Sequence, residues 1–220
     1  MANEWIMYGI GDNAPDCIHN FGELLSFIDQ VGFLPLFRNE ISGFSVEEHA
    51  NPHYWWTDNE ERDPWQWRKQ ASRSHAVAYG KFFGGKAGFI SMEWLPAFIA
   101  FRRNGYDFED LWYAGQVQFR QKKIMDSLIE TPELPGWELK RRAGFGTGGE
   151  RNFAGTVTAL QKMLFMVIGE FRRRLTLLAG TSMDLGIHNH YKSKLNNEIS
   201  LYKIGLTGVM MPEVILLYRF

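Results

Sequence analysis

Asn152-Phe-Ala-Gly-Thr-Val-Thr-Ala-Leu-Gln-Lys-Met-Leu-Phe-Met166 is the stretch that decides the fold prediction. Its apolar side chains recur at helical spacing and form a single stripe, made of Phe153, Val157, Leu160 and Leu164. Asn152 stands where an N-cap is expected, because its side chain can accept a hydrogen bond from the first free amides of a helix. The opposite face carries Arg151, Gly155, Thr158 and Lys162. The stretch therefore predicts an amphipathic helix.

The helical pattern changes into a strand pattern directly afterwards. Residues 164–171 are apolar and β-branched, and they lead into Arg172, Arg173 and Arg174. Two further helices are predicted upstream, over residues 117–128 and 135–142. Two helices, a turn, a third helix and a hairpin with a basic tip are typical of a helix-turn-helix with a wing. The sequence thus predicts an α+β protein with a helix-rich winged-helix architecture and short β-hairpins.

The composition is that of a globular protein. With 220 residues, the chain is long enough for one compact domain or two small ones. The single cysteine, Cys17, excludes an internal disulfide and suits a reducing compartment. We recognise no signal peptide, and the longest apolar run is interrupted by Pro212 and Glu213. We therefore expect a cytoplasmic protein with no membrane partner.

Charge is unevenly distributed along the chain, although the net charge is only −1. Residues 1–114 carry 9 Lys and Arg against 16 Asp and Glu, a net of −7. Residues 115–205 carry 14 against 8, a net of +6. This asymmetry predicts that the second half faces an anion, whereas the alternative is a chance segregation of solvated charge.

Four segments are predicted from these patterns. Residues 1–20 are an irregular arm, residues 21–114 an aromatic-rich acidic half, residues 115–205 the basic winged-helix half, and residues 206–220 a tail. No internal sequence repeat is evident, although the first half also reads as helices followed by a hairpin.

Local signals predict the elements of the first half. A helix over residues 21–31 ends at Gly32, and Ser45 with Glu48 forms a capping-box signal. Asp63 is expected to cap a helix that begins at Pro64. Strands at residues 76–83 and 87–91 flank a glycine turn, and Ser91 is expected to cap a helix over residues 92–103.

Several motifs of the first half resemble those of the small bacterial AlkZ-related proteins. They are Phe33-Leu34-Pro35-Leu36-Phe37, Gly43-Phe44-Ser45, Trp55-Trp56, Asp63-Pro64-Trp65, Tyr79-Gly80-Lys81-Phe82-Phe83, Lys86-Ala87-Gly88-Phe89, Glu93-Trp94-Leu95-Pro96 and Arg102-Arg103-Asn104-Gly105-Tyr106. The resemblance covers residues 21–171 and includes Leu160-Gln161. It implies kinship with winged-helix DNA glycosylases that remove alkylated bases. Those enzymes use a Gln-x-Gln or Gln-x-Asp motif, and we interpret Gln116-Val117-Gln118 here as a coincidence.

An aromatic and acidic stretch supplies a second candidate site. Its possible pocket residues are Trp55, Trp56, Asp63, Trp65, Trp67, Tyr79 and Lys81. These side chains suit a pocket that stacks a flat ligand or an extruded base. The alternative is a tryptophan-rich core that joins the two halves.

The leading functional prediction is a winged-helix protein that binds duplex DNA and is either non-enzymatic or of unknown activity. The predicted DNA contacts are Lys140, Arg141, Arg142, Arg151, Thr158, Lys162, Arg172, Arg173 and Arg174. A glycosylase-like enzyme acting on damaged bases and a structural or protein-binding winged helix are the alternatives. No cofactor or metal is expected, because the glycine-rich loop at residues 144–149 lacks a P-loop ending and His188 and His190 lack partners at metal spacing. The sequence does not specify an oligomeric state.

Overall fold

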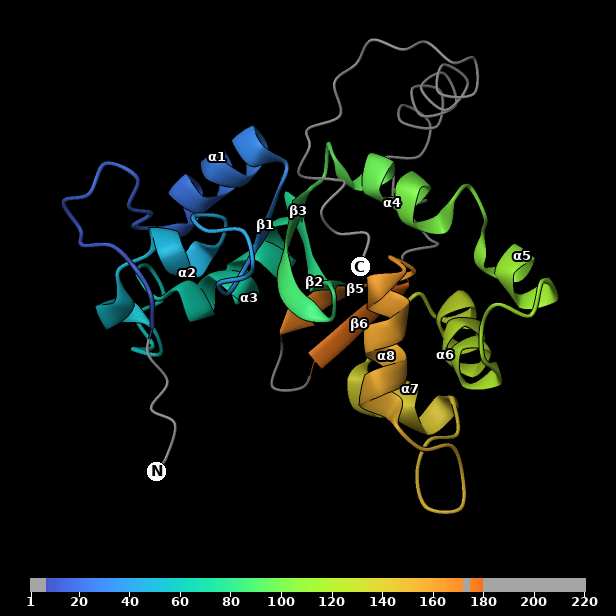
Figure 1. The fold of residues 1–220 in the computed structure, drawn as a ribbon. Helices are drawn as coiled ribbons and strands as arrows, with labels where there is room; N and C mark the ends of the chain where they lie inside the picture. Colours follow the sequence, from blue (N-terminus) through green and yellow to red (C-terminus); the bar gives the residue numbers. More distant parts are fainter. Residues whose placement is uncertain (1–6, 172–174, 180–220) are drawn as a thin grey trace, which may run out of the picture.

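The structure is a computed structural model that describes residues 7–171 and 175–179 (Figure 1). Helices and short antiparallel strands alternate along these residues, which confirms the α+β prediction. The helices are α1 (Phe21–Val31), α2 (Val46–His49), the 3-10 helix η1 (Pro52–Tyr54), α3 (Pro64–Ser74), α4 (Leu95–Arg103), α5 (Phe108–Tyr113), α6 (Phe119–Glu130), α7 (Gly136–Arg142) and α8 (Phe153–Lys162). The strands are β1 (Phe33–Pro35), β2 (Val77–Phe83), β3 (Lys86–Ser91), β4 (Glu133–Pro135), β5 (Met166–Phe171) and β6 (Leu175–Ala179).

Two sheets have the same strand arrangement. The first has the order β1-β3-β2 and the second the order β4-β6-β5, and all pairs are antiparallel. Each sheet follows the same chain order of helix, strand, helical segments and two strands. We call α1 to β3 the first repeat and α6 to β6 the second repeat.

The register of the two sheets is equivalent. In the first repeat, Phe89 lies opposite Leu34 on one side and Tyr79 on the other. In the second repeat, Leu177 lies between Leu134 and Ile168 in the same way. The long hairpin strand of each repeat also has a bulge within one residue of the equivalent position, after Gly80 in β2 and after Ile168 in β5. The described residues therefore contain an internal structural repeat.

A few apolar residues preserve this repeat at the sequence level. Leu24 and Ile28 of α1 are fully buried, and so are Ile124 and Leu128 of α6, each 100 positions later. The short strands β1 and β4 both end in Leu-Pro, with the leucine buried in each case. The spacing between the first helix and the first strand of the sheet is therefore the same in both repeats.

The two repeats pack against each other reciprocally. Helix α3 of the first repeat contacts β5, helix α8 of the second contacts β2, and β2 lies beside β5 (Figure 1). Their interface is apolar, because Leu164 and Val167 pack into a cluster with Phe82 and Phe83 of the first hairpin. The repeats are thus joined through a common core, while α4 and α5 carry the chain from one to the other.

Most local predictions agree with the structure. Gly32 follows α1 at φ +80°, and Asp63 and Asn152 cap α3 and α8, as predicted. Asn20, for which no cap was predicted, caps α1. The predicted start of α4 is wrong, since this helix begins at Leu95. Ser91 ends β3 instead, and its hydroxyl oxygen accepts a hydrogen bond from the Trp94 amide at 3.3 Å.

Some predictions fall on residues that the structure does not describe. Arg172, Arg173, Arg174, His188, His190 and the tail lie outside the described ranges. Within those ranges, no helix has both the length and the apolar character that crossing a membrane requires.

Candidate nucleic-acid interface

Helix α8 presents only a narrow strip of its surface. Val157 and Leu160 are buried in the core of the second repeat, and Phe153 packs at its edge. Arg151 and Lys162 are exposed at the two ends of the helix, whereas Thr158 between them is half-buried. The predicted outer face therefore exists, but its middle is partly covered.

The start of α8 is shaped by the glycine-rich loop. Asn152 adopts φ +62°, and its side-chain oxygen accepts a hydrogen bond from the Gly155 amide at 3.2 Å. The loop closes on itself, because the Glu150 amide donates to the Gly144 oxygen at 2.9 Å. Lys123 lies 3.3 Å from the Glu150 carboxylate and fixes the loop to α6. This loop is a turn before a helix, as the sequence predicts.

Helix α7 carries a basic cluster around one carboxylate. Arg141 donates to both oxygens of Glu138, at 2.6 and 3.0 Å, and Arg142 donates to one of them at 2.8 Å. These bonds, chiefly from Arg141, lower the pKa of Glu138 to about 2. Two guanidinium groups share a single carboxylate, so the cluster keeps a net positive charge, and Lys140 beside it is also exposed.

Two arginines of α4 were not among the predicted site residues. Arg103 donates to the Leu164 main-chain oxygen, and its guanidinium carbon lies 4.0 Å from the centre of the Phe165 ring. Burial lowers the pKa of Arg103 to about 10. Arg102 donates to the Lys162 main-chain oxygen at 3.3 Å. Both side chains tie α4 to the end of α8, a role that their position at a helix C-terminus does not reveal in the sequence.

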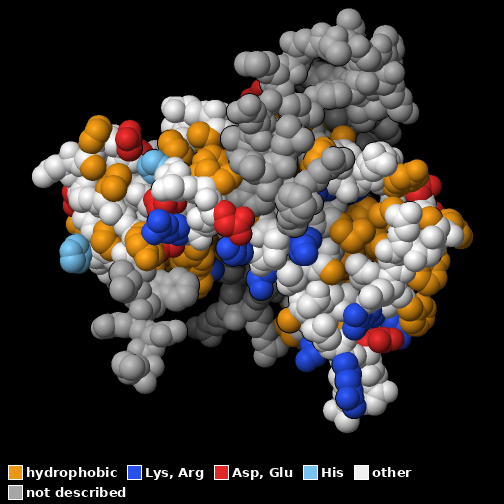
Figure 2. Space-filling view, viewed as in Figure 1, with side chains coloured by type: hydrophobic (Ala, Val, Ile, Leu, Met, Phe, Trp, Pro, Cys, Tyr) orange, Lys and Arg blue, Asp and Glu red, His pale blue; other side chains and the backbone are white. Residues whose placement is uncertain are grey.

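Basic side chains gather around α7, α8 and the β2–β3 hairpin. Figure 2 shows Lys and Arg side chains along this part of the surface, over elements of both repeats. Lys81 is exposed on β2, and its main-chain amide donates to the Gln161 side-chain oxygen at 3.0 Å. The structure thus brings Lys81, a predicted pocket residue, to the side of α8.

The aromatic stretch forms a core for most of its length. Trp55, Trp67 and Tyr79 are at most 5% exposed and belong to the apolar cluster beneath the first sheet. Trp67 also donates its indole N–H to the Glu61 main-chain oxygen at 2.7 Å. These three rings have the positions that the core interpretation requires.

Asp63 is buried and engaged by main-chain amides. Its carboxylate accepts from the amides of Trp56 at 3.1 Å, Asp58 at 3.2 Å and Trp65 at 2.8 Å. Trp56 and Asp58 both adopt φ +59°, so the carboxylate stabilises a turn that needs left-handed backbone at non-glycine residues. The geometry is that of a structural cap on α3.

Two tryptophans of this stretch reach the surface. Trp56 is 50% exposed and Trp65 is half-buried, with ring centres 6.3 Å apart. The guanidinium carbon of Arg68 lies 3.1 Å from the centre of the Trp65 ring, so that ring face is occupied by a cation from the same helix. Burial lowers the pKa of Arg68.

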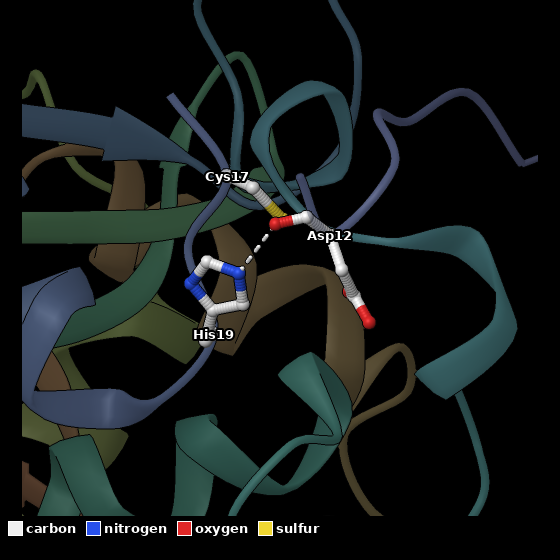
Figure 3. Close-up of side chains that lie close together, drawn as sticks. All are labelled: Asp12, Cys17 and His19. Carbon is white, nitrogen blue, oxygen red and sulfur yellow. Dashed lines mark hydrogen bonds between the residues drawn. The ribbon is translucent and has the colours of Figure 1, made fainter. Parts of the chain in front are cut away.

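Asp12, Cys17 and His19 cluster near the N-terminus, with possible ligand atoms within 4.8 Å of one another. Figure 3 shows the His19 ring directed at the main-chain oxygen of Asp12, which it meets at 2.9 Å. The other ring nitrogen lies 3.0 Å from Glu23, so both nitrogens face acceptors and the imidazolium form is favoured. Accordingly, the pKa of His19 is raised, first by the bond to the Asp12 main chain. A ring that donates from both nitrogens has no lone pair for a metal.

The Asp12 carboxylate is also engaged within the protein. It accepts from Asn51 at 2.9 Å and from Arg62 at 2.8 Å, and the hydrogen bond from Asn51 is the main reason that its pKa is lowered. The cluster therefore fastens the N-terminal arm to the segment around η1.

Comparison of the chain with known proteins gives one family. No curated protein matches the chain. No solved structure matches it either. Residues 18–181, well over half of the 220, match the family described as AlkZ related. On the strength of that match, the chain belongs to the AlkZ-related family.

Proposed function

We propose that this protein binds duplex DNA through a winged helix formed by the second repeat. The observation that carries the proposal is the arrangement of α7, α8 and the β5–β6 hairpin, which follow one another around a three-stranded antiparallel sheet. Two helices joined by a loop and followed by a hairpin are the elements of a winged helix-turn-helix. Membership of the AlkZ-related family suggests an association with DNA repair.

Charge supports the same surface. Lys140, Arg141 and Arg142 lie on α7, and Arg151 and Lys162 lie at the two ends of α8. All of them are exposed. Sequence position adds Arg172, Arg173 and Arg174, which follow β5 in the chain. Such side chains contact phosphates and position a protein on a duplex without reading its sequence.

Thr158 contributes less than the sequence indicates. It is half-buried in the middle of α8, where a winged helix would read base edges. We therefore propose that phosphate contacts supply most of the binding free energy and that base readout is minor.

The aromatic stretch does not favour a glycosylase activity. A base-excision site needs a pocket and a group that activates water, yet the Asp63 carboxylate is buried and accepts hydrogen bonds from main-chain amides. The proposal is accordingly a DNA-binding protein in which Asp63 has a structural role.

A salt series tests the proposal. The replacement Arg151→Gln with Lys162→Gln should weaken binding to a short fluorescein-labelled duplex of mixed sequence, measured by anisotropy. Each phosphate contact that the replacement removes should reduce the slope of log affinity against log salt by about 0.9. The control is Arg38→Gln in the first repeat, where Arg38 pairs with Glu48. If the unmutated protein shows no salt-dependent binding, the proposal is wrong.

A further inference from the structure

The acidic half contains a segment with no acidic residue. Residues 64–92, which span α3, β2 and β3, hold five Lys and Arg residues and no Asp or Glu. Arg68 is buried against Trp65, but Lys81 and Lys86 are exposed on the hairpin. The negative charge of the first half therefore lies on other elements, and this hairpin is cationic.

A bulge turns Lys81 outward. The pairing of β2 with β3 shifts between Gly80 and Phe83, so the strict alternation of sides is interrupted there. Phe82 and Phe83 are both buried as a result, and Lys81 is the exposed residue of β2. The lysine thus leaves the sheet at the edge that faces the second repeat.

The hairpin is held against α8 by specific contacts. The Lys81 amide donates to Gln161, which is 2% exposed, at 3.0 Å. At the hairpin turn, an added Cβ on Gly85 would lie 3.6 Å from the Thr158 methyl carbon, an ordinary van der Waals distance. Below these contacts, Leu164 packs in one cluster with the hairpin phenylalanines. The relative position of the hairpin and α8 is therefore fixed.

We propose that the β2–β3 hairpin of the first repeat acts as an additional basic wing beside α8, and that Lys81 and Lys86 contact phosphates of the duplex. The proposal rests on the proposed DNA binding of the second repeat and extends that surface across the boundary between the repeats. The partner is the sugar-phosphate backbone, because lysine ammonium groups on a hairpin offer point charges and no planar pattern for a base edge. The position of the hairpin turn against α8 also explains why Thr158 is half-buried.

The test compares single charge deletions of equal size. Lys81→Gln, Lys86→Gln and the double variant are measured with the labelled duplex over a salt series, beside Arg38→Gln as the charge-matched control and Arg151→Gln with Lys162→Gln as the α8 variant. We expect each hairpin deletion to reduce the salt slope by about 0.9 and the double variant by about 1.8. Arg38→Gln should leave the slope unchanged. Circular dichroism and thermal melts confirm that each variant is folded.

The outcomes separate the two proposals. If the α8 variant has a reduced slope while the hairpin variants bind with the slope of Arg38→Gln, the hairpin does not touch the duplex and the proposed function stands. If the hairpin variants have a reduced slope and the α8 variant does not, the hairpin proposal holds and the surface assigned to α8 is wrong. If the unmutated protein does not bind with a salt-dependent affinity, both proposals are overturned.

Discussion

Replacing Asp63 by alanine should lower the free energy of unfolding by about 2–4 kcal/mol, because its buried carboxylate accepts hydrogen bonds from three main-chain amides. Loss of the N-cap of α3 costs about 1 kcal/mol. The amides of Trp56 and Asp58 also lose their hydrogen-bond partner, at a cost of about 1 kcal/mol each. This is the low end of the usual cost of an unpaired amide, because both residues are exposed and water can reach them.

Asparagine provides a graded comparison at the same position. Its side chain keeps one oxygen, which can replace the Asp63 atom that now accepts from Trp56 and Trp65. Only the bond from the Asp58 amide is removed, so Asp63→Asn should cost about 1 kcal/mol. The hydrogen bonds alone therefore predict that stability increases from Asp63→Ala to Asp63→Asn to the unmutated protein.

Urea denaturation followed by tryptophan fluorescence measures both effects, provided that the m-value is unchanged. The control is Glu60→Gln, which removes an exposed carboxylate from the same turn and should change stability by less than about 0.5 kcal/mol. If Asp63→Ala and Asp63→Asn both behave like this control, the carboxylate does not hold the turn. It would then be free to meet a ligand, and the structural reasoning would be refuted.

Three further predictions concern the packing and the N-terminal arm. Trp67 is fully buried, so Trp67→Ala should lower the free energy of unfolding, measured by urea denaturation, by about 3–5 kcal/mol. Trp56 is 50% exposed, so Trp56→Ala should lower it by less than half as much, and equal effects would contradict the difference in burial. Gln161→Leu should lower the free energy of unfolding by about 1–3 kcal/mol by leaving the Lys81 amide unpaired, and a stability equal to that of the unmutated protein would mean that this bond is not formed. Because the pKa of His19 is raised in the folded protein, protonated His19 stabilises the fold fully below its ordinary pKa of about 6.5, and this stabilisation is lost as pH rises through the folded pKa. His19→Gln should therefore destabilise the protein more near pH 5.5 than near pH 9. An effect that does not change with pH would exclude the imidazolium.

Local structure was predictable where a short stretch carries its own signal. The predicted caps at Ser45, Asp63 and Asn152 are all formed, because each depends on a side chain and an amide two or three residues away. The hairpin around Gly84-Gly85 was predictable for the same reason, since both glycines adopt positive φ. The start of α4 was missed because Ser91 completes a sheet pairing with Val77, a tertiary contact that sequence spacing does not contain.

The internal repeat could not be read from the sequence. Its matching positions are a few buried residues, such as Leu24 with Ile124 and Leu34 with Leu134, separated by stretches that share little. The second helical position also differs, since α2 with η1 in one repeat corresponds to α7 in the other. Equivalence becomes visible only in strand register, which links residues far apart in the chain.

The charge of the first hairpin was not visible in the sequence for a related reason. Charge was summed over sequence halves, and the net of −7 for residues 1–114 conceals the basic segment at residues 64–92. The corresponding segment of the second repeat, residues 151–175, holds five Lys and Arg residues against one Glu. In both repeats, therefore, the third helix and its hairpin are basic, whatever the charge of the surrounding half. Because α8 packs on β2 and α3 packs on β5, the reciprocal packing brings elements of these two basic segments together. If the proposed duplex binds at α8, we therefore expect it to contact the first hairpin as well. The charges that predict such contacts are those of elements adjacent in space, not those of one half of the sequence.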